Sequence, residues 1–142
     1  MTRGLLHHVE IWVPDLGRST ESLGWLLETL GYEPFQTWEH GRSWRQNATY
    51  IVLEESPALS EHHYDRLRPG LNHLAFHCGS QSECDQLVSE SLRHGWALLF
   101  PDLHPNAGGP DHYAGFLTDA DGFEVELVAD DHVPQQFRTP GT

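Results

Sequence analysis

The sequence predicts an α+β protein of two tandem modules, each with the order strand, helix, strand, strand, strand. Two apolar runs of similar pattern, residues 5–13 and 71–78, align with an offset of 65 positions. A helical pattern follows each run and stops at a glycine, Gly31 in the first half and Gly95 in the second. Short strand-like runs follow each helix. This repetition predicts a duplicated βαβββ unit.

In the first half, the strand at 5–13 is followed by a turn at 14–17 and a helix over about 19–30. Four leucines lie on one face of that helix, at helical spacing: Leu23, Leu26, Leu27 and Leu30. We expect three strands after it, at 33–37, 43–46 and 49–54.

In the second half, the strand at 71–78 precedes a turn at Gly79-Ser80 and a helix over 81–93. The expected strands are 97–100, 113–118 and 124–128. The modules therefore cover 1–56 and 71–129, with a polar connector at 57–70 and a poorly ordered tail at 130–142. Because each half is small, we expect the two to form one domain.

The composition excludes several classes of function. The 142 residues carry 8 Arg, no Lys and 21 acidic side chains, a formal charge of −13, which argues against a nucleic-acid partner. Without lysine, Schiff-base chemistry and a Walker-type phosphate site are excluded. No apolar run is long enough for a membrane span and no signal peptide is recognisable, so we expect a cytoplasmic protein. The two cysteines, Cys78 and Cys84, are expected to be reduced thiols.

Histidines and carboxylates fall on equivalent strands of the two halves. His8 and His73 are aligned by the repeat, and Glu124 and Glu126 share one face of the last strand because side chains alternate. Two imidazoles with a carboxylate suit a divalent ion, Zn, Ni, Mn, Co or Fe(II), and leave positions open for a substrate oxygen. The alternative is a pair of hydrogen-bonded strand histidines beside a half-exposed strand.

Several segments resemble those of the vicinal oxygen chelate superfamily, which includes glyoxalase I, extradiol dioxygenases, fosfomycin-resistance transferases and bleomycin-binding proteins. The most specific are residues 72–76, Asn-His-Leu-Ala-Phe, and 119–127, Asp-x-Asp-Gly-x-x-x-Glu-Leu. The first half adds His8-Val9 and residues 13–16 and 30–32. The resemblance covers residues 5–128.

The resemblance implies a curved sheet around a metal-binding cup. Its metal ligands would be His8, His73 and Glu126, with Glu54 as a fourth candidate. Whether Glu54 faces the metal depends on the register of its strand. Glu126 or Glu54 would also serve as a catalytic base.

The chain differs from the family in its first helix and in one loop. Gly24-Trp25 replaces a common Phe-Tyr pair, and about two extra residues separate Asp15 from Leu30. The loop at 101–113 is unusually rich in polar and turn residues. These differences argue against a glutathione-linked activity and leave the cup itself in place.

Five further residues are candidates for the site. His77 shares a face with His73 and is a catalytic candidate, or else a hydrogen-bonded core histidine. Trp44 and Arg45 would bind substrate, the arginine through a carboxylate or phosphate, unless they only form a charged strand edge. His112 and Tyr113, at the end of the polar loop, would bind substrate from a lid, unless the loop is merely an irregular connector.

Together these features predict a metal-dependent enzyme whose small substrate chelates a divalent ion through vicinal oxygens. An isomerase or lyase and an Fe(II) dioxygenase share this ligand set. The alternative function is a non-catalytic binder, like the antibiotic-sequestering members. A third possibility is an accessory domain with a vestigial metal. We expect a homodimer that binds a small molecule, with no nucleic-acid or membrane partner.

Overall fold

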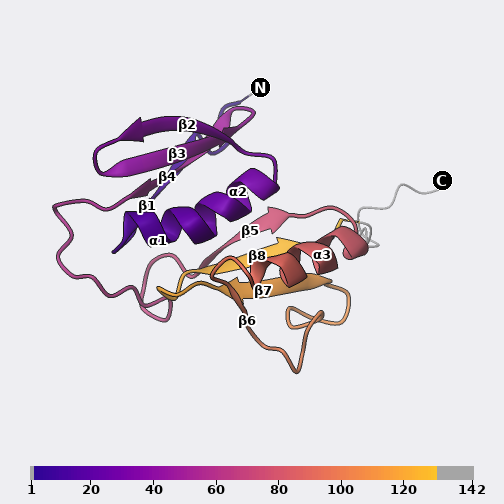
Figure 1. Ribbon diagram of the computed structural model, residues 1–142. Coiled ribbons are helices and arrows are strands. Elements are labelled where there is room, and N and C mark those ends of the chain that lie inside the picture. The colour runs from indigo at the N-terminus through magenta and orange to yellow at the C-terminus, as the bar shows by residue number, and fades with distance from the viewer. Residues whose placement is uncertain (1, 131–142) are drawn as a thin grey trace. The chain divides into compact units, whose positions relative to one another are not determined.

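The computed structural model describes residues 2–130 and divides into two units, with the boundary between Tyr64 and Asp65 (Figure 1). The boundary falls inside the predicted connector at 57–70. Each unit is a four-stranded mixed sheet with its helical segment packed on one face. The predicted tail lies, from residue 131 onward, outside the described residues.

The first unit has the strand order β1-β4-β3-β2. Strand β1 runs parallel to β4, and the other neighbours are antiparallel. Its elements are β1 (His8–Trp12), α1 (Leu16–Ser19), η1 (Thr20–Gly24), α2 (Trp25–Thr29), β2 (Glu33–Trp38), β3 (Gly41–Gln46) and β4 (Thr49–Glu54).

The helical face of the first unit contains the expected leucines. Leu23, Leu26 and Leu27 are buried, as are Ile51 and Leu53 on the same unit's central strand. The helical segment begins at Leu16, earlier than the expected Ser19, because the Asp15 side chain caps it by accepting a hydrogen bond from the Arg18 N–H at 2.9 Å.

The middle of this helical segment, η1, is π-helical, which the periodicity did not predict. The wider turn accommodates extra residues between Asp15 and Leu30. The Thr20 hydroxyl donates to the Leu16 carbonyl at 2.7 Å, a side-chain bond that competes with the regular ladder. Gly24 allows this segment to pack closely on the sheet, because a Cβ there would lie 2.7 Å from the Trp44 ring.

The second unit has the strand order β5-β8-β7-β6, again with the first strand parallel to its neighbour. Its elements are β5 (His73–His77), α3 (Gln81–Ser91), β6 (Ala97–Leu98), β7 (Ala114–Thr118) and β8 (Glu124–Val128). Ser80 and Glu83 form a reciprocal capping box at the start of α3. The same element order in both units confirms the predicted pair of βαβββ modules.

Helix α3 packs closely on the sheet of the second unit. Leu87 and Val88 of the helix are buried, as are Val125 and Leu127 of β8. Gly115 of β7 permits this approach, because a Cβ there would lie 2.6 Å from Val88 Cγ2. The opposite face of the sheet is left for polar side chains.

The two cysteines form a disulfide, so the expectation of reduced thiols was wrong. Cys78 follows β5 directly and Cys84 lies in the first turn of α3, with 5.4 Å between their Cα atoms. The strand end and the helix start meet there, which a spacing of six residues does not reveal in the sequence. Among residues 2–130, no helix is both long and apolar enough to span a bilayer.

Candidate functional site

The face of the second sheet opposite α3 carries a group of histidines and carboxylates. In the parallel ladder, His73 pairs with Glu124, and Ala75 pairs with Glu126. On the other side of β8, Phe116 pairs with Glu126. Because side chains alternate, His73, Glu124, Glu126 and Phe116 all lie on this face.

Glu126 is contacted by two imidazoles, one on each carboxylate oxygen. His73 Nε2 lies 3.2 Å from Oε1, and His112 Nε2 contacts Oε2. Glu126 is only 8% exposed, whereas both histidines are partly exposed. We refer to these three residues as the His73–Glu126–His112 cluster.

The other ring nitrogen of His73 is held by acceptors. Nδ1 lies 2.7 Å from Asn72 Oδ1 and 3.2 Å from Glu124 Oε2. The Asn72 amide nitrogen donates to the Arg66 carbonyl at 3.1 Å, which fixes the amide oxygen toward His73. Glu124 also pairs with the Arg66 guanidinium at 3.4 Å. His73 therefore donates from Nδ1 and directs Nε2 at Glu126.

His112 reaches the cluster from the polar loop before β7. Its backbone carbonyl accepts from Asn106 Nδ2 at 3.2 Å, and its N–H donates to the Gly109 carbonyl at 3.1 Å. A Cβ on Gly108 would lie 2.6 Å from the imidazole, so a larger residue at this position would displace the ring. The neighbouring Tyr113 turns the other way, and its hydroxyl donates to Asp85 of α3 at 2.7 Å. The loop therefore brings His112 to the cluster and Tyr113 to the helix.

The donor types of this cluster are ones that a divalent cation accepts, whereas their spacing in this structure is not that of an ion site. Two imidazole nitrogens and a buried carboxylate are ligand types that zinc and other first-row ions accept. A second set of groups, Asn72 and Glu124, orients His73 as outer groups orient metal-bound histidines. His73 and His112 each contact Glu126 directly, and within residues 2–130 no three His, Cys, Asp or Glu side chains are spaced to hold an ion.

His8 lies in the corresponding position of the first unit. It pairs with Tyr50 in the β1–β4 ladder, as His73 pairs with Glu124 in the second unit. The His8 ring stacks on Tyr50 with 4.8 Å between centroids, and its Nδ1 lies 2.9 Å from His7 Nδ1. His8 is exposed, so its imidazole is accessible.

Glu54 lies on the same face of the sheet as His8. The β4 residue that pairs with His8 is Tyr50, and Glu54 lies four residues beyond Tyr50 on that strand. The separation along the strand is roughly 13 Å at about 3.3 Å per residue. The position that corresponds to Glu126 is the partner of Glu10, which is Val52. Glu54 instead accepts a hydrogen bond from Trp38 Nε1 at 3.1 Å. The register does not support Glu54 as the counterpart of Glu126.

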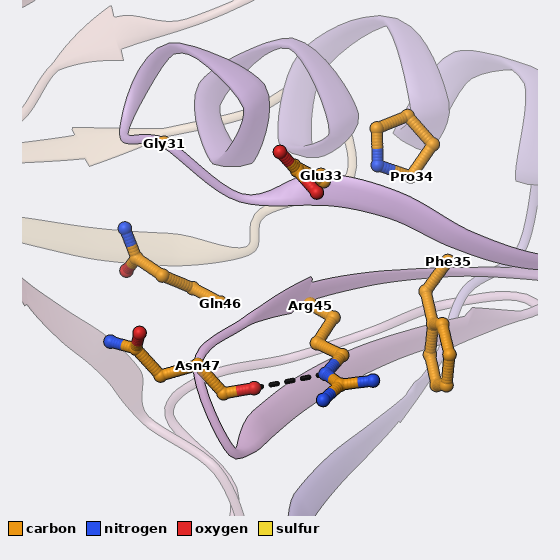
Figure 2. A pocket seen from close by; sticks show the side chains of 7 residues that line it. All are labelled: Gly31, Glu33, Pro34, Phe35, Arg45, Gln46 and Asn47. Atoms are coloured by element: carbon orange, nitrogen blue, oxygen red, sulfur yellow. Dashed lines mark hydrogen bonds between the residues drawn. The ribbon is translucent and has the colours of Figure 1, made fainter.

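Arg45 lines a cavity of about 540 Å³ at the edge of the first unit (Figure 2). Its Nε donates to the Asn47 carbonyl at 2.9 Å, and its guanidinium lies 5.3 Å from the centre of the Phe35 ring. It also lines a second cavity of about 600 Å³ with Phe35 and Tyr50. An arginine held beside aromatic rings suits a carboxylate or phosphate group on an apolar ligand.

Two other candidates lie apart from these groups. Trp44 is 3% exposed and packs on Gly24 in the helix–sheet core of the first unit. The His77 side chain is 87% exposed and its Nδ1 lies 2.6 Å from Asp130 Oδ1. His77 is four residues from His73 along β5, so it does not reach the His73–Glu126–His112 cluster.

The residues that orient His73 were missed in the sequence. Asn72 is adjacent to His73 in the sequence, and this position beside a candidate ligand is the signal that could have identified it. Arg66 lies in the connector, and no local pattern relates it to Glu124. Tyr50 and Phe35 were also missed, although alternation from Arg45 and His8 places polar and aromatic side chains on that face.

Known proteins resemble this chain in sequence and in fold. A family model of the glyoxalase/bleomycin resistance protein/dioxygenase superfamily matches residues 7–116. The uncharacterized protein YqjT of Bacillus subtilis (strain 168) is 44% identical over 126 residues, which is 87% of this chain and 98% of that protein.

Solved structures show the same fold. A Bacillus halodurans protein, named only provisionally as a glyoxalase, is 42% identical with a TM-score of 0.85, covering 91% of this chain and 98% of that one. The fosfomycin resistance protein FosX of Listeria monocytogenes, complexed with Mn(II) and dihydroxypropylphosphonic acid, is 20% identical with a TM-score of 0.59, covering 90% of each chain. The likeness to FosX concerns the fold alone.

Proposed function

Because the chain belongs to the glyoxalase/bleomycin resistance protein/dioxygenase superfamily, we propose that it is a metal-dependent enzyme for a small substrate with vicinal oxygens. The observation that carries the proposal is the buried Glu126 carboxylate with His73 Nε2 at 3.2 Å. We propose His73 and Glu126 as metal ligands from the second unit, and His8 as the ligand from the first.

Three features support this ligand set. The hydrogen bonds from His73 Nδ1 leave Nε2 directed at the carboxylate, which is the orientation of metal-bound histidines with an outer acceptor. His8 occupies the ladder position equivalent to His73 and is exposed. FosX, which shares the fold, was crystallised with Mn(II).

The chain's own groups have separate roles in this proposal. A bound divalent ion contributes Lewis-acid chemistry, which lowers the free energy of negative charge on a substrate oxygen. Glu126 is the proposed base. Its carboxylate lies on this face of the sheet, and its burial keeps water away from it. Arg45 is the proposed contact for an anionic substrate group. Trp44 is left out of the substrate site because it is buried in the core.

A non-catalytic binding protein is the second candidate function. The observation that favours it is the cavity lined by Phe35, Arg45 and Tyr50, which offers aromatic and cationic contacts and needs no metal. A sequestering pocket would bind its ligand equally well in the presence of a chelator. The two functions therefore differ in their dependence on metal.

Metal content tests the proposed function. We expect protein purified without added metal, then equilibrated with Mn(II), Co(II) or Zn(II) and desalted, to keep about one ion per chain. The variants His8→Ala, His73→Ala and Glu126→Gln should each lower the affinity at least ~10-fold, since each removes a donor. His63→Ala, an exposed histidine in the connector, is the matched control and should bind as the wild type does.

Two results would overturn the proposal. Wild-type protein that takes up no divalent ion would favour the sequestering function. Uptake that survives both His73→Ala and Glu126→Gln would place the ion elsewhere. The expected homodimer is tested separately by light scattering during gel filtration, with and without metal.

A further inference from the structure

We propose that the cavity of about 600 Å³ in the first unit binds a small aromatic monocarboxylate, with its carboxylate on Arg45 and its ring against Phe35. The inference rests on the proposed function only in taking this ligand as the substrate, because the binding itself needs no metal ion. It assigns a chemical class to that substrate: a single negative charge on a planar carboxylate, attached to an aromatic body.

Arg45 and Tyr50 lie side by side on one face of the first sheet, because they are partners in the β3–β4 ladder. Both side chains line the cavity of about 600 Å³. Phe35 of β2 extends this wall, with 5.5 Å between the centres of the Phe35 and Tyr50 rings. The volume falls within the range of small-molecule sites, about 300–1,000 Å³.

Residues that precede β1 form the other wall of the cavity, and hydrogen bonds attach them to β4. The Thr49 hydroxyl donates to the Leu6 carbonyl at 3.0 Å, and the Tyr50 N–H donates to the His7 carbonyl at 3.3 Å. Leu5 and Leu6 line the cavity and are 70% and 68% exposed. Apolar side chains held at a cavity and left in water indicate a place where the apolar part of a ligand is buried.

The charge of Arg45 is not balanced by a carboxylate of the described chain. Arg18, Arg66 and Arg68 each pair with a carboxylate. Arg45 forms no ion pair within residues 2–130, although Glu33 is its partner in the β2–β3 ladder. The guanidinium can therefore pair with a carboxylate that a ligand supplies.

The hydrogen bonding of Arg45 favours a carboxylate over a phosphate. Its Nε donates to the Asn47 carbonyl at 2.9 Å, which leaves the two Nη groups for a ligand (Figure 2). Two N–H groups at a fixed spacing match the two oxygens of one planar carboxylate. A phosphate monoester carries close to two negative charges. Arg45 is the one arginine among the residues that line either cavity, and Glu33 in the smaller cavity adds a negative charge that opposes a dianion.

The rings around the cavity favour an aromatic body over a saturated one. The His8 ring covers one face of Tyr50, stacked within 3° at 4.8 Å. The centres of the Phe35 and Tyr50 rings are 5.5 Å apart, too close for a ligand ring to lie between them, since ring atoms pack about 3.5 Å apart. Phe35 is 43% exposed. A ligand ring therefore packs on the exposed part of Phe35, where ring–ring contact adds to the burial of apolar area.

Calorimetry with four probes, in buffer that contains EDTA, tests the proposal. 2-Naphthoate has the proposed chemistry. 2-Naphthamide removes the charge, 2-naphthyl phosphate makes it a dianion, and decahydro-2-naphthoate keeps the carbon skeleton without the aromatic ring. We expect about one 2-naphthoate per chain, with the amide and the phosphate at least ~10-fold weaker. The saturated acid should be at least ~3-fold weaker, since it lacks the ring–ring contact.

Substitutions at two residues of the cavity separate the charge from the ring. Arg45→Gln should weaken 2-naphthoate binding at least ~10-fold, and Arg45→Lys, which keeps the charge without the paired N–H groups, at least ~3-fold. Phe35→Leu keeps apolar area and should remove the preference for 2-naphthoate over its saturated analogue. Arg93→Gln removes an exposed arginine after α3 and is the matched control, which should bind as the wild type does. Circular dichroism establishes that each variant is folded.

The outcomes separate this inference from the proposed function. Wild-type affinity in Arg45→Gln, equal or tighter binding of any of the other three probes, or a retained ring preference in Phe35→Leu would overturn the inference. Failure of 2-naphthoate to bind to protein that takes up its metal ion overturns the inference and leaves the proposed function standing. Binding of 2-naphthoate by protein that takes up no divalent ion supports this ligand class and favours the sequestering function.

Discussion

Val52 occupies, in the first unit, the ladder position that Glu126 occupies in the second. Val52 is paired with Glu10, two residues beyond His8, and Glu126 is paired with Ala75, two residues beyond His73. The two units therefore differ chemically at this position. The second unit has a buried carboxylate there, and the first has a buried valine. The metal-ligand candidates are unequally divided between the units for this reason.

The first prediction concerns Glu54. Glu54 accepts from the Trp38 indole and lies roughly 13 Å along the strand from the position beside His8, at about 3.3 Å per residue. We expect Glu54→Gln to change the Co(II) affinity less than ~2-fold and to lower stability by about 1 kcal/mol, since the bond to Trp38 becomes uncharged. Calorimetry and urea unfolding measure the two effects. A large loss of Co(II) affinity would restore Glu54 to the ligand set.

The second prediction concerns Asp119, in the turn before β8. Its Oδ1 accepts from the Asp121 and Phe123 N–H groups, whereas the buried Oδ2 has no hydrogen-bond partner among residues 2–130. Desolvation raises the pKa of the Asp119 carboxyl to about 6.

This raised pKa has a definite sign for stability. Between about pH 4 and 6 the folded state keeps the proton that the unfolded state has lost, so the free energy of unfolding falls as pH rises. A pKa difference of about two corresponds to roughly 3 kcal/mol. We expect Asp119→Asn to abolish this part of the pH dependence, measured by urea unfolding of both proteins from pH 4 to 7. Parallel curves for the two proteins would contradict the assignment.

The third prediction concerns the packing of α3. Gly115→Ala places a methyl group 2.6 Å from Val88 Cγ2, so either the Val88 side chain or the helix that carries it must shift. We expect a loss of about 1–3 kcal/mol in the free energy of unfolding, as for other overpacked cores. The double variant with Val88→Ala should recover part of this loss. Unchanged stability in Gly115→Ala would mean that the helix is less closely packed than described.

The fourth prediction concerns the disulfide. Cys78 and Cys84 join the end of β5 to the first turn of α3, and the closed loop is short. We expect thiol titration of the denatured, unreduced protein to find no free thiol, and Cys84→Ser to lower stability by ~2 kcal/mol. Two free thiols per chain in protein purified without reductant would contradict the bond.

The element order was predictable because its signals are local. Apolar alternation, the helical spacing of leucines and the glycines at 31 and 95 each depend on a few neighbouring residues. The resemblance to the superfamily implied that His73 and Glu126 lie near one another, and in the structure the two side chains are 3.2 Å apart on one face of the sheet.

Features that depend on how strands pair were not predictable. The register of β1 against β4 decides between Val52 and Glu54, and no local pattern sets it. Alternation alone could not tell which of Trp44 and Arg45 faces the helix, and Trp44 does. The contact of His112 with Glu126 depends on the path of a long loop, and the Cys78–Cys84 bond on the angle between β5 and α3.

Anomalous diffraction from crystals of the wild-type chain grown with Co(II) tests the central claim most directly. The account predicts a single strong anomalous peak per chain within bonding distance, about 2.0–2.2 Å, of His73 Nε2 and a Glu126 carboxylate oxygen. A peak bonded to other residues, or no peak in crystals whose solution contains excess Co(II), would contradict it.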